Sequence, residues 1–284
     1  MATHLDQPQE EREMSFIDHL EELRWHLIRS VIAILVFSIV AFISVDFVFN
    51  TVIFGPARPD FWTFKMLCKL AEAINSPALC IEALDFKIQS RQMTGQFTMH
   101  ITSSFVIGLI IAFPYVFWEF WRFISPGLHM TEKSISRGAV FSVTVLFASG
   151  VMFGYFIMSP LAVSFLAGYQ VSALVSNEFD ITSYISTLSS LVLGSGLLFQ
   201  LPIVVFFLSK LGIVTPEIMR HYRKHAVVVI LIMGAVFTPP DPLSQVLIAL
   251  PLLGLYQFSI FISAGVHRRA ARKEKREALK SKNS

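Results

Sequence analysis

Two carboxylates beside apolar segments are the residues of this sequence best suited to bind a charged partner. Glu22 follows Glu21 in a short polar stretch that leads into an apolar run, and Glu132 follows Thr131 just before another. Thr131 can cap a helix that begins there, and the helix dipole favours the ionised form of Glu132. The pattern alone leaves two interpretations open: a site for a basic partner, or surface charges that are simply solvated.

Two further polar side chains lie inside apolar runs, where they are costly. Glu119 is followed three residues later by Arg122, which predicts a local ion pair on one helix face. Gln200 precedes Pro202, which removes a helical hydrogen bond. Gln200 can hydrogen-bond to a neighbouring helix or face a cavity, and both roles stay open.

The segment Gly194-Ser195-Gly196 raises the question of an intramembrane serine hydrolase. A serine nucleophile needs a histidine at the same depth, but His100 and His225 lie at the ends of their apolar runs. Close packing of small residues between helices is the favoured interpretation. The sequence contains no phosphate loop, zinc motif or dinucleotide fingerprint, so we expect no cofactor and no metal.

The composition predicts the elements that must hold these residues. Of the 284 residues, 54% are hydrophobic, and the mean hydropathy is +0.61. These values are typical of an all-α polytopic membrane protein and exclude an ordinary soluble domain. A membrane span needs about 20 apolar residues. The apolar runs predict six spans, the fifth of them short, in a membrane domain of residues 1–266: 27–48, 97–121, 139–161, 185–208, 225–237 and 243–266.

The distribution of positive charge sets the expected orientation. Most of the 23 lysines and arginines fall on the side that holds the N-terminus if all six runs cross the membrane. The positive-inside rule then places both termini in the cytoplasm. Without the short fifth span, the basic C-terminal segment would lie outside. The charge pattern therefore supports that span independently.

Two segments outside the spans are distinctive. The long outer loop 49–96 contains both cysteines, Cys68 and Cys80, which can form a disulfide or stay as free thiols. The basic tail 267–284 is expected to be disordered in the cytoplasm and to contact anionic membrane lipids. It lacks aromatic residues for base stacking, so we expect no nucleic-acid partner.

Several ordered motifs resemble those of the TatC family, the multi-spanning core subunits of the twin-arginine (Tat) protein translocase. The resemblance covers about residues 15–265. The motifs are His19-Leu-Glu-Glu-Leu-Arg24, Phe123-Ile-Ser-Pro-Gly-Leu128 with Glu132, Gln200-Leu-Pro202 and Thr238-Pro-Pro-Asp-Pro-Leu-Ser-Gln245.

The resemblance implies six spans in a concave, glove-like arrangement within the bacterial inner membrane, with both termini cytoplasmic. It implies a receptor, not an enzyme, that binds the twin-arginine signal peptides of folded export substrates. The partners implied are the single-span subunits TatA and TatB, with TatB and TatC units forming an oligomer. Transport would use the proton motive force.

The family roles transfer to matching residues. Glu22 and Glu132 match the carboxylates that receive the arginine pair, and Arg24, Phe123 and Pro126 match residues that shape this site. Gln200 matches a polar residue of the membrane cavity. Asp241 matches the acidic residue of an outer turn, and Gln245 a partner-helix contact.

This sequence departs from the family pattern at two places. His26 replaces an arginine common in the first motif, and the outer loop with Cys68 and Cys80 resembles an insertion. A proton- or solute-coupled secondary transporter is the alternative function. It would need an ionisable relay in the middle of the membrane, and Gln200 cannot titrate.

Overall fold

The structure is a computed structural model that describes residues 16–73, 75–76, 80, 86–124, 133–172, 174–238 and 241–282. Within these residues, five helical segments are long and apolar enough to cross a membrane: Leu20–Ile43, Gly95–Ile124, Val140–Gly168, Ile181–Lys210 and Ser244–Arg269. They overlap the five long apolar runs of the sequence, and the protein is an all-α polytopic membrane protein. The short fifth run forms helix α10 (Arg223–Phe237), which has only 15 residues, so its crossing stays a prediction.

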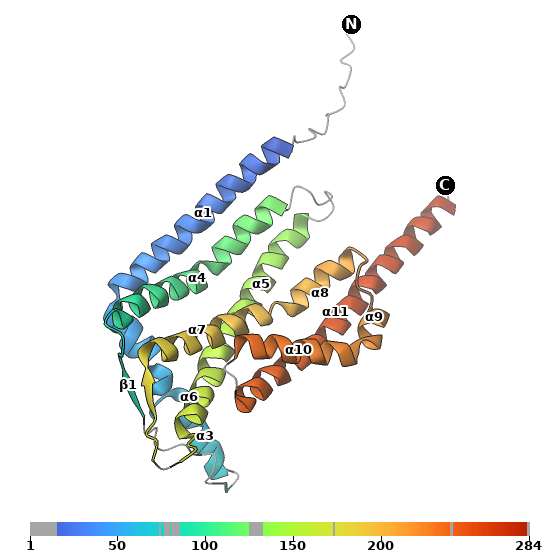
Figure 1. Cartoon of the computed structure of the whole chain (residues 1–284). Helices are drawn as coiled ribbons and strands as arrows, with labels where there is room; N and C mark the ends of the chain where they lie inside the picture. Colours follow the sequence, from blue (N-terminus) through green and yellow to red (C-terminus); the bar gives the residue numbers. More distant parts are fainter. Residues whose placement is uncertain are drawn as a thin grey trace.

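The two longest helices of the N-terminal half, α1 (Phe16–Ile43) and α4 (Gly95–Ile124), pack along each other (Figure 1). Gly108 allows this contact, because a Cβ atom at Gly108 would lie 2.6 Å from the backbone nitrogen of Ser38. The start of α1, the end of α4 and the end of α11 lie toward the same, upper end of the molecule in Figure 1.

The third span is one continuous rod made of three elements. These are α5 (Lys133–Phe153), the π-helical turn η6 (Gly154–Met158) and α6 (Ser159–Gly168). The rod packs against α7 (Ile181–Leu198).

Small residues make this crossing close. A Cβ atom at Gly150 of α5 would lie 2.6 Å from the carbonyl oxygen of Ser195 and 2.9 Å from the Cα atom of Gly196. The Gly194-Ser195-Gly196 segment is therefore a helix-packing surface, as predicted.

The fourth span is broken in the middle. Helix α7 ends at Leu198 and α8 (Leu201–Lys210) begins after a turn at Phe199 and Gln200. Pro202 explains the break, because it cannot donate a backbone hydrogen bond to the preceding turn. Helix α9 (Pro216–His221) then leads into α10.

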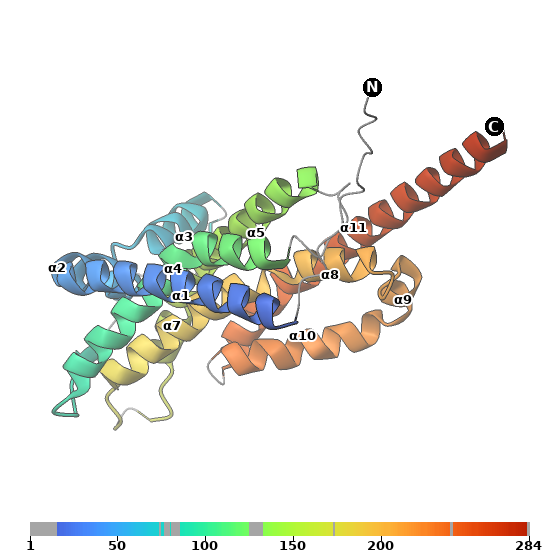
Figure 2. The ribbon, with the colours of Figure 1, turned by 90° about the horizontal axis from the view of Figure 1, so that it is seen from above.

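Helix α11 (Pro242–Lys282) packs against α8, and Figure 2 shows the two side by side. Helix α11 also includes residues 267–282, so the expected disorder of this tail was wrong. The tail is rich in Ala, Arg, Lys, Glu and Leu, which are strong helix formers. Extending the preceding span costs no new helix nucleus.

Loop 49–96, predicted to lie outside, contains regular structure. After the short helix α2 (Val45–Phe47) come the π-helix η1 (Val48–Ile53), the 3₁₀ turn η2 (Gly55–Ala57), α3 (Trp62–Ala73) and strand β1 (Lys87–Gln89). Strand β1 pairs in parallel with β2 (Glu178–Asp180), which directly precedes α7. A disulfide joins Cys68 of α3 to Cys80.

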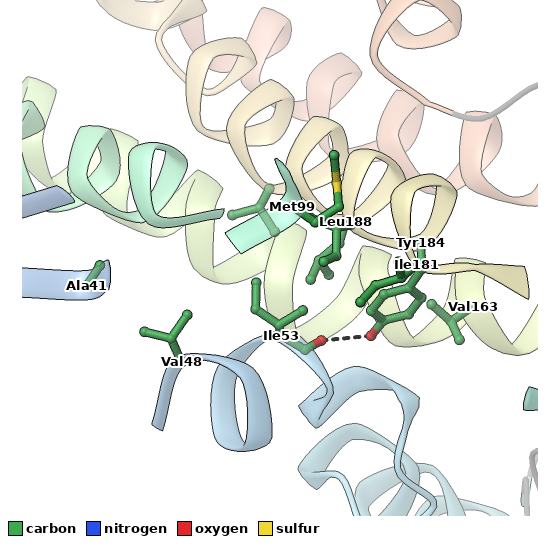
Figure 3. Packing of buried hydrophobic residues seen from close by; sticks show 10 residues of the cluster. Ala41, Val48, Ile53, Met99, Val163, Ile181, Tyr184 and Leu188 are labelled. Atoms are coloured by element: carbon green, nitrogen blue, oxygen red, sulfur yellow. Dashed lines mark hydrogen bonds between the residues drawn. The ribbon is translucent and has the colours of Figure 1, made fainter. Parts of the chain in front are cut away.

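The half of the bundle next to loop 49–96 has a core of ten buried residues, drawn in Figure 3: Ala41, Val48, Ile53, Met99, Val163, Ile181, Tyr184, Ile185, Leu188 and Val192. The Tyr184 hydroxyl donates a 2.8 Å hydrogen bond to the carbonyl of Ile53. This bond ties the π-helix η1 to α7. A second core joins α10 and α11 to the middle spans: Met158, Ala162, Leu191, Leu198, Ile230, Ile248 and Leu252.

Candidate functional site

A buried pair of ionisable side chains lies at the end of the bundle where α1 begins and α4 ends. His26 of α1 contacts Oε2 of Glu119 through its Nδ1 atom. Their side chains are only 8% and 2% exposed. The three-residue spacing of Glu119 and Arg122 predicted an ion pair between them, and this prediction was wrong. Arg122 is exposed, with its guanidinium 5.8 Å from the centre of the Trp118 ring.

The Glu119 carboxylate has a second partner, since the Tyr115 hydroxyl donates a 2.9 Å hydrogen bond to Oε1. Both oxygens of the buried carboxylate are therefore bonded, which offsets much of its cost of desolvation. The His26 ring lies 6.2 Å, centre to centre, from the ring of Phe123 in an edge arrangement. Phe123, predicted to shape the binding site, thus lies beside this pair.

Glu22 lies one helical turn before His26 on α1. Its Oε1 atom is 3.9 Å from Nε2 of His26, and its side chain is 35% exposed. Arg24 pairs with Glu21 at 3.7 Å, and both of these side chains are more than 60% exposed. The structure therefore gives Glu22 a place between the solvated surface and the buried pair, while Glu21 and Arg24 neutralise each other outside it.

The other predicted residues of this site, Glu132 and Pro126, lie outside the described residues. Both belong to the segment between the end of α4 at Ile124 and the start of α5 at Lys133. In the sequence, Glu132 directly precedes the first residue of α5. Its pairing with Glu22 stays a prediction.

Gln200 lies at the break between α7 and α8. Its Nε2 atom donates to the carbonyls of Val143 on α5 at 3.3 Å and of Gly196 at 3.4 Å. Its Oε1 atom is buried without a partner among the described residues. Gln200 thus bridges two helices, and a role facing the membrane cavity stays a prediction.

An apolar groove of about 370 Å³ lies near the break between α7 and α8, and Pro202 is one of its lining residues. Helices α5, α8 and α11 line it with Gly138, Ser142, Leu146, Pro202, Ile203, Phe206, Phe207, Phe258 and Ile262. An extended apolar segment fits the chemistry of this lining.

Asp241, which directly precedes α11, is only 5% exposed. Its Oδ1 atom accepts a 2.7 Å bond from the backbone N–H of Ser244, which is the geometry of a helix N-cap. Gln245 donates from Nε2 to the carbonyl of Leu231 at 3.5 Å and so reaches α10. In the structure Asp241 caps the start of α11, and Gln245 joins α11 to α10.

The pairing of His26 with Glu119 was not predicted. A usable signal was present: both are ionisable, His26 directly precedes the run 27–48, and Glu119 lies near the end of the run 97–121 predicted to face the same side. Two such groups at one depth in the membrane are expected to pair, because an isolated buried charge is costly.

Comparison with known proteins shows the family to which this chain belongs. The profile of the family described as "Sec-independent protein translocase protein (TatC)" matches residues 18–251. The TatC protein of Blattabacterium sp. subsp. Periplaneta americana is 38% identical over 92% of this chain and 98% of its own length. That of Aquifex aeolicus is 34% identical over 92% of this chain and 98% of its own.

The fold also matches solved structures. A crystal structure of the twin-arginine translocase receptor TatC has a TM-score of 0.65 at 33% identity and covers 88% of this chain and 99% of its own. A second crystal structure of that receptor, in DDM, has a TM-score of 0.67 at 34% identity, with 86% and 99% covered. This chain therefore belongs to the TatC family of Sec-independent protein translocase proteins, and it is a multi-pass translocase subunit of the bacterial inner membrane rather than an enzyme.

Proposed function

We propose that this chain is the receptor for twin-arginine signal peptides and that Glu22 and Glu132 receive the two arginines. The observation that carries the proposal is the position of Glu22, which is half-exposed beside the buried His26–Glu119 pair. The neighbouring Arg24 is paired with Glu21 and does not occupy the carboxylate of Glu22. Glu132, which directly precedes α5 in the sequence, would supply the second carboxylate.

The chemistry of arginine suits this site. A guanidinium is always charged and can bind a carboxylate through two parallel N–H bonds, whereas a lysine ammonium is a compact point charge. Two charges 4 Å apart attract by about 1 kcal/mol in water and by about 4 kcal/mol at an effective dielectric of about 20. A pair of carboxylates at the membrane interface therefore discriminates in favour of an arginine pair.

The apolar stretch of the signal peptide would lie in the groove between α5, α8 and α11. Aromatic and aliphatic side chains line the groove, so the contact would depend on hydrophobicity and not on sequence. The contact with Glu22 and Glu132 would supply the specificity. Gln200 lies two positions before Pro202, which lines this groove.

The single-span partners TatA and TatB would dock on α10 and α11. Several aliphatic side chains are exposed on these helices: Val228, Val229, Ile232, Val236, Val246 and Leu250. In a membrane, such faces accept another apolar helix by close packing. The bond from Gln245 to the carbonyl of Leu231 joins α11 to α10 beside these faces. TatB–TatC units would form the oligomer. The proton motive force would drive transport.

Site-specific photo-crosslinking tests the receptor function. A photoreactive group beside the arginine pair of a signal peptide is expected to crosslink to the segment around Glu22 in membranes that contain this chain. Glu22→Gln, Glu132→Gln and a twin-lysine peptide should each abolish the crosslink. Glu21→Gln is the matched control, because Glu21 is an exposed neighbour whose partner is Arg24.

Crosslinks that persist in all three cases would show that the acidic pair is only surface charge. A separate assay distinguishes the receptor from a secondary transporter. Vesicles that contain only this chain are expected to take up no solute in response to a proton gradient, and uptake would favour the transporter.

A further inference from the structure

The His26 ring lies between two carboxylates. On one side its Nδ1 atom contacts the buried Glu119, and on the other its Nε2 atom faces Glu22 at 3.9 Å. The second distance is that of a charge interaction through space and exceeds a hydrogen bond. Glu119 is itself held by Tyr115, and the backbone carbonyl of His26 accepts a 2.9 Å bond from the hydroxyl of Ser30. The ring is therefore fixed in direction.

The protonation state of the His26 ring determines the charge that Nε2 presents to Glu22. An ionised carboxylate only accepts hydrogen bonds, so Nδ1 carries a proton toward Glu119 in either state of the ring. When the ring is charged, Nε2 also carries a proton, and positive charge faces Glu22. When the ring is neutral, Nε2 presents a lone pair to Glu22. The three side chains then carry a formal charge of −2 in place of −1.

We infer that Glu119 fixes His26 as a positioning residue whose protonation state sets how strongly Glu22 attracts the arginine pair of a signal peptide. The charged ring competes with the incoming guanidinium for Glu22, and the neutral ring does not. Binding of an arginine pair is then tighter at higher pH. This inference rests on the proposed function and specifies how the same site is regulated.

Other charged groups around the ring do not produce this pH dependence. On α1 they are Glu22 and Arg29, and on α4 they are Tyr115, Glu119 and Arg122. Arginine, tyrosine and carboxylate side chains do not ordinarily titrate between about pH 6 and 8, whereas histidine does. A change in affinity across this range therefore reports on histidine.

Peptide binding to the purified full-length chain in nanodiscs tests the inference. The probe is a fluorescent synthetic peptide with an Arg-Arg pair ahead of an apolar stretch, and its Kd is measured by anisotropy at about pH 6 and about pH 8. For the unchanged chain we expect a Kd about threefold to tenfold lower at the higher pH, as one nearby charge at an intermediate dielectric predicts.

Two substitutions separate charge from structure. His26→Gln still donates a hydrogen bond to Glu119 but cannot titrate, and its Kd is expected to be independent of pH and close to the unchanged chain's value at about pH 8. His26→Arg is permanently charged, and its Kd is expected to be independent of pH and close to the value at about pH 6. His225→Gln, at an exposed histidine of α10, should leave the full pH dependence in place.

The outcomes distinguish the inference from the proposed function. If His26→Gln keeps the full pH dependence, or if the unchanged chain shows none, the inference is wrong even where Glu22→Gln abolishes binding. If Glu22→Gln binds the peptide as tightly as the unchanged chain does, the proposed function itself is wrong. Opposite, pH-independent levels for His26→Gln and His26→Arg would support both.

Discussion

His26 of α1 and Glu119 of α4 form a buried hydrogen-bonded pair although 93 residues separate them in the sequence. The pair joins the two helices at the end of the bundle where Glu22 lies. Because each ionisable group satisfies the other, the two helices can keep charge inside an apolar bundle. The same contact places a titratable ring beside a half-exposed carboxylate.

Removing one member of this pair is expected to destabilise the protein strongly. Glu119→Ala leaves Nδ1 of His26 and the Tyr115 hydroxyl without their acceptor, and the loss should be about 2 to 5 kcal/mol for two unsatisfied donors. Thermal unfolding in detergent measures the loss, and a double-mutant cycle with His26→Ala isolates the coupling. Glu21→Ala is the control, since its pair with Arg24 is exposed and is worth at most about 1 kcal/mol. Equal effects of both substitutions would contradict a buried pair.

The close approach of α1 and α4 depends on Gly108. Gly108→Val should destabilise the chain by about 1 to 3 kcal/mol, because the added atoms would overlap the backbone of Ser38. Thermal stability in detergent is the measurement. Gly254→Ala on α11 is the matched control, since a Cβ atom there meets nothing within 4 Å. A Gly108→Val protein as stable as the control would mean that the two helices pack less closely than the structure shows.

The junction of β2 and α7 is expected to weaken in acid. The hydroxyl and backbone N–H of Thr182 and the backbone N–H of Arg91 donate to the Asp180 carboxylate, and these bonds lower the pKa of Asp180. A lowered pKa stabilises the fold above the carboxyl's ordinary range, and this contribution is lost as the pH falls through the folded-state value.

Asp180→Asn tests this relation, because it keeps an acceptor oxygen but cannot titrate. The difference in unfolding temperature between the two proteins should be constant near neutral pH and shrink below about pH 4. A difference that stays constant down to about pH 2 would show that the ionised form of Asp180 has no role in stability.

The disulfide between Cys68 and Cys80 is expected to stabilise the outer segment locally. The two residues are 12 positions apart, and a closed loop of about this length is worth about 3 kcal/mol in the chain-entropy account. The Cys68→Ser/Cys80→Ser double variant should be cleaved faster by protease between these positions, while the membrane helices stay protected. Faster cleavage in the helices as well would mean that the bridge supports the whole fold.

Much of the fold could be predicted from the sequence, but the contacts of the site could not. The long apolar runs, the break at Pro202 and the small-residue packing around Ser195 follow from local composition. The helical tail was not predicted, although its Ala, Leu, Glu, Lys and Arg residues are strong helix formers. Glu119 was assigned to Arg122 because only neighbours on one helix can be read from spacing.

The sequence by itself determined where the membrane helices lie. In lipid, a backbone must satisfy its hydrogen bonds within its own segment, so an apolar run of sufficient length forms a helix whatever surrounds it. The tertiary structure decided which polar groups meet. His26 reaches Glu119 only because Gly108 lets α1 lie close along α4, with those two faces turned toward each other. The rotation of a helix about its axis is fixed by packing over its whole length, and no local stretch of sequence specifies it.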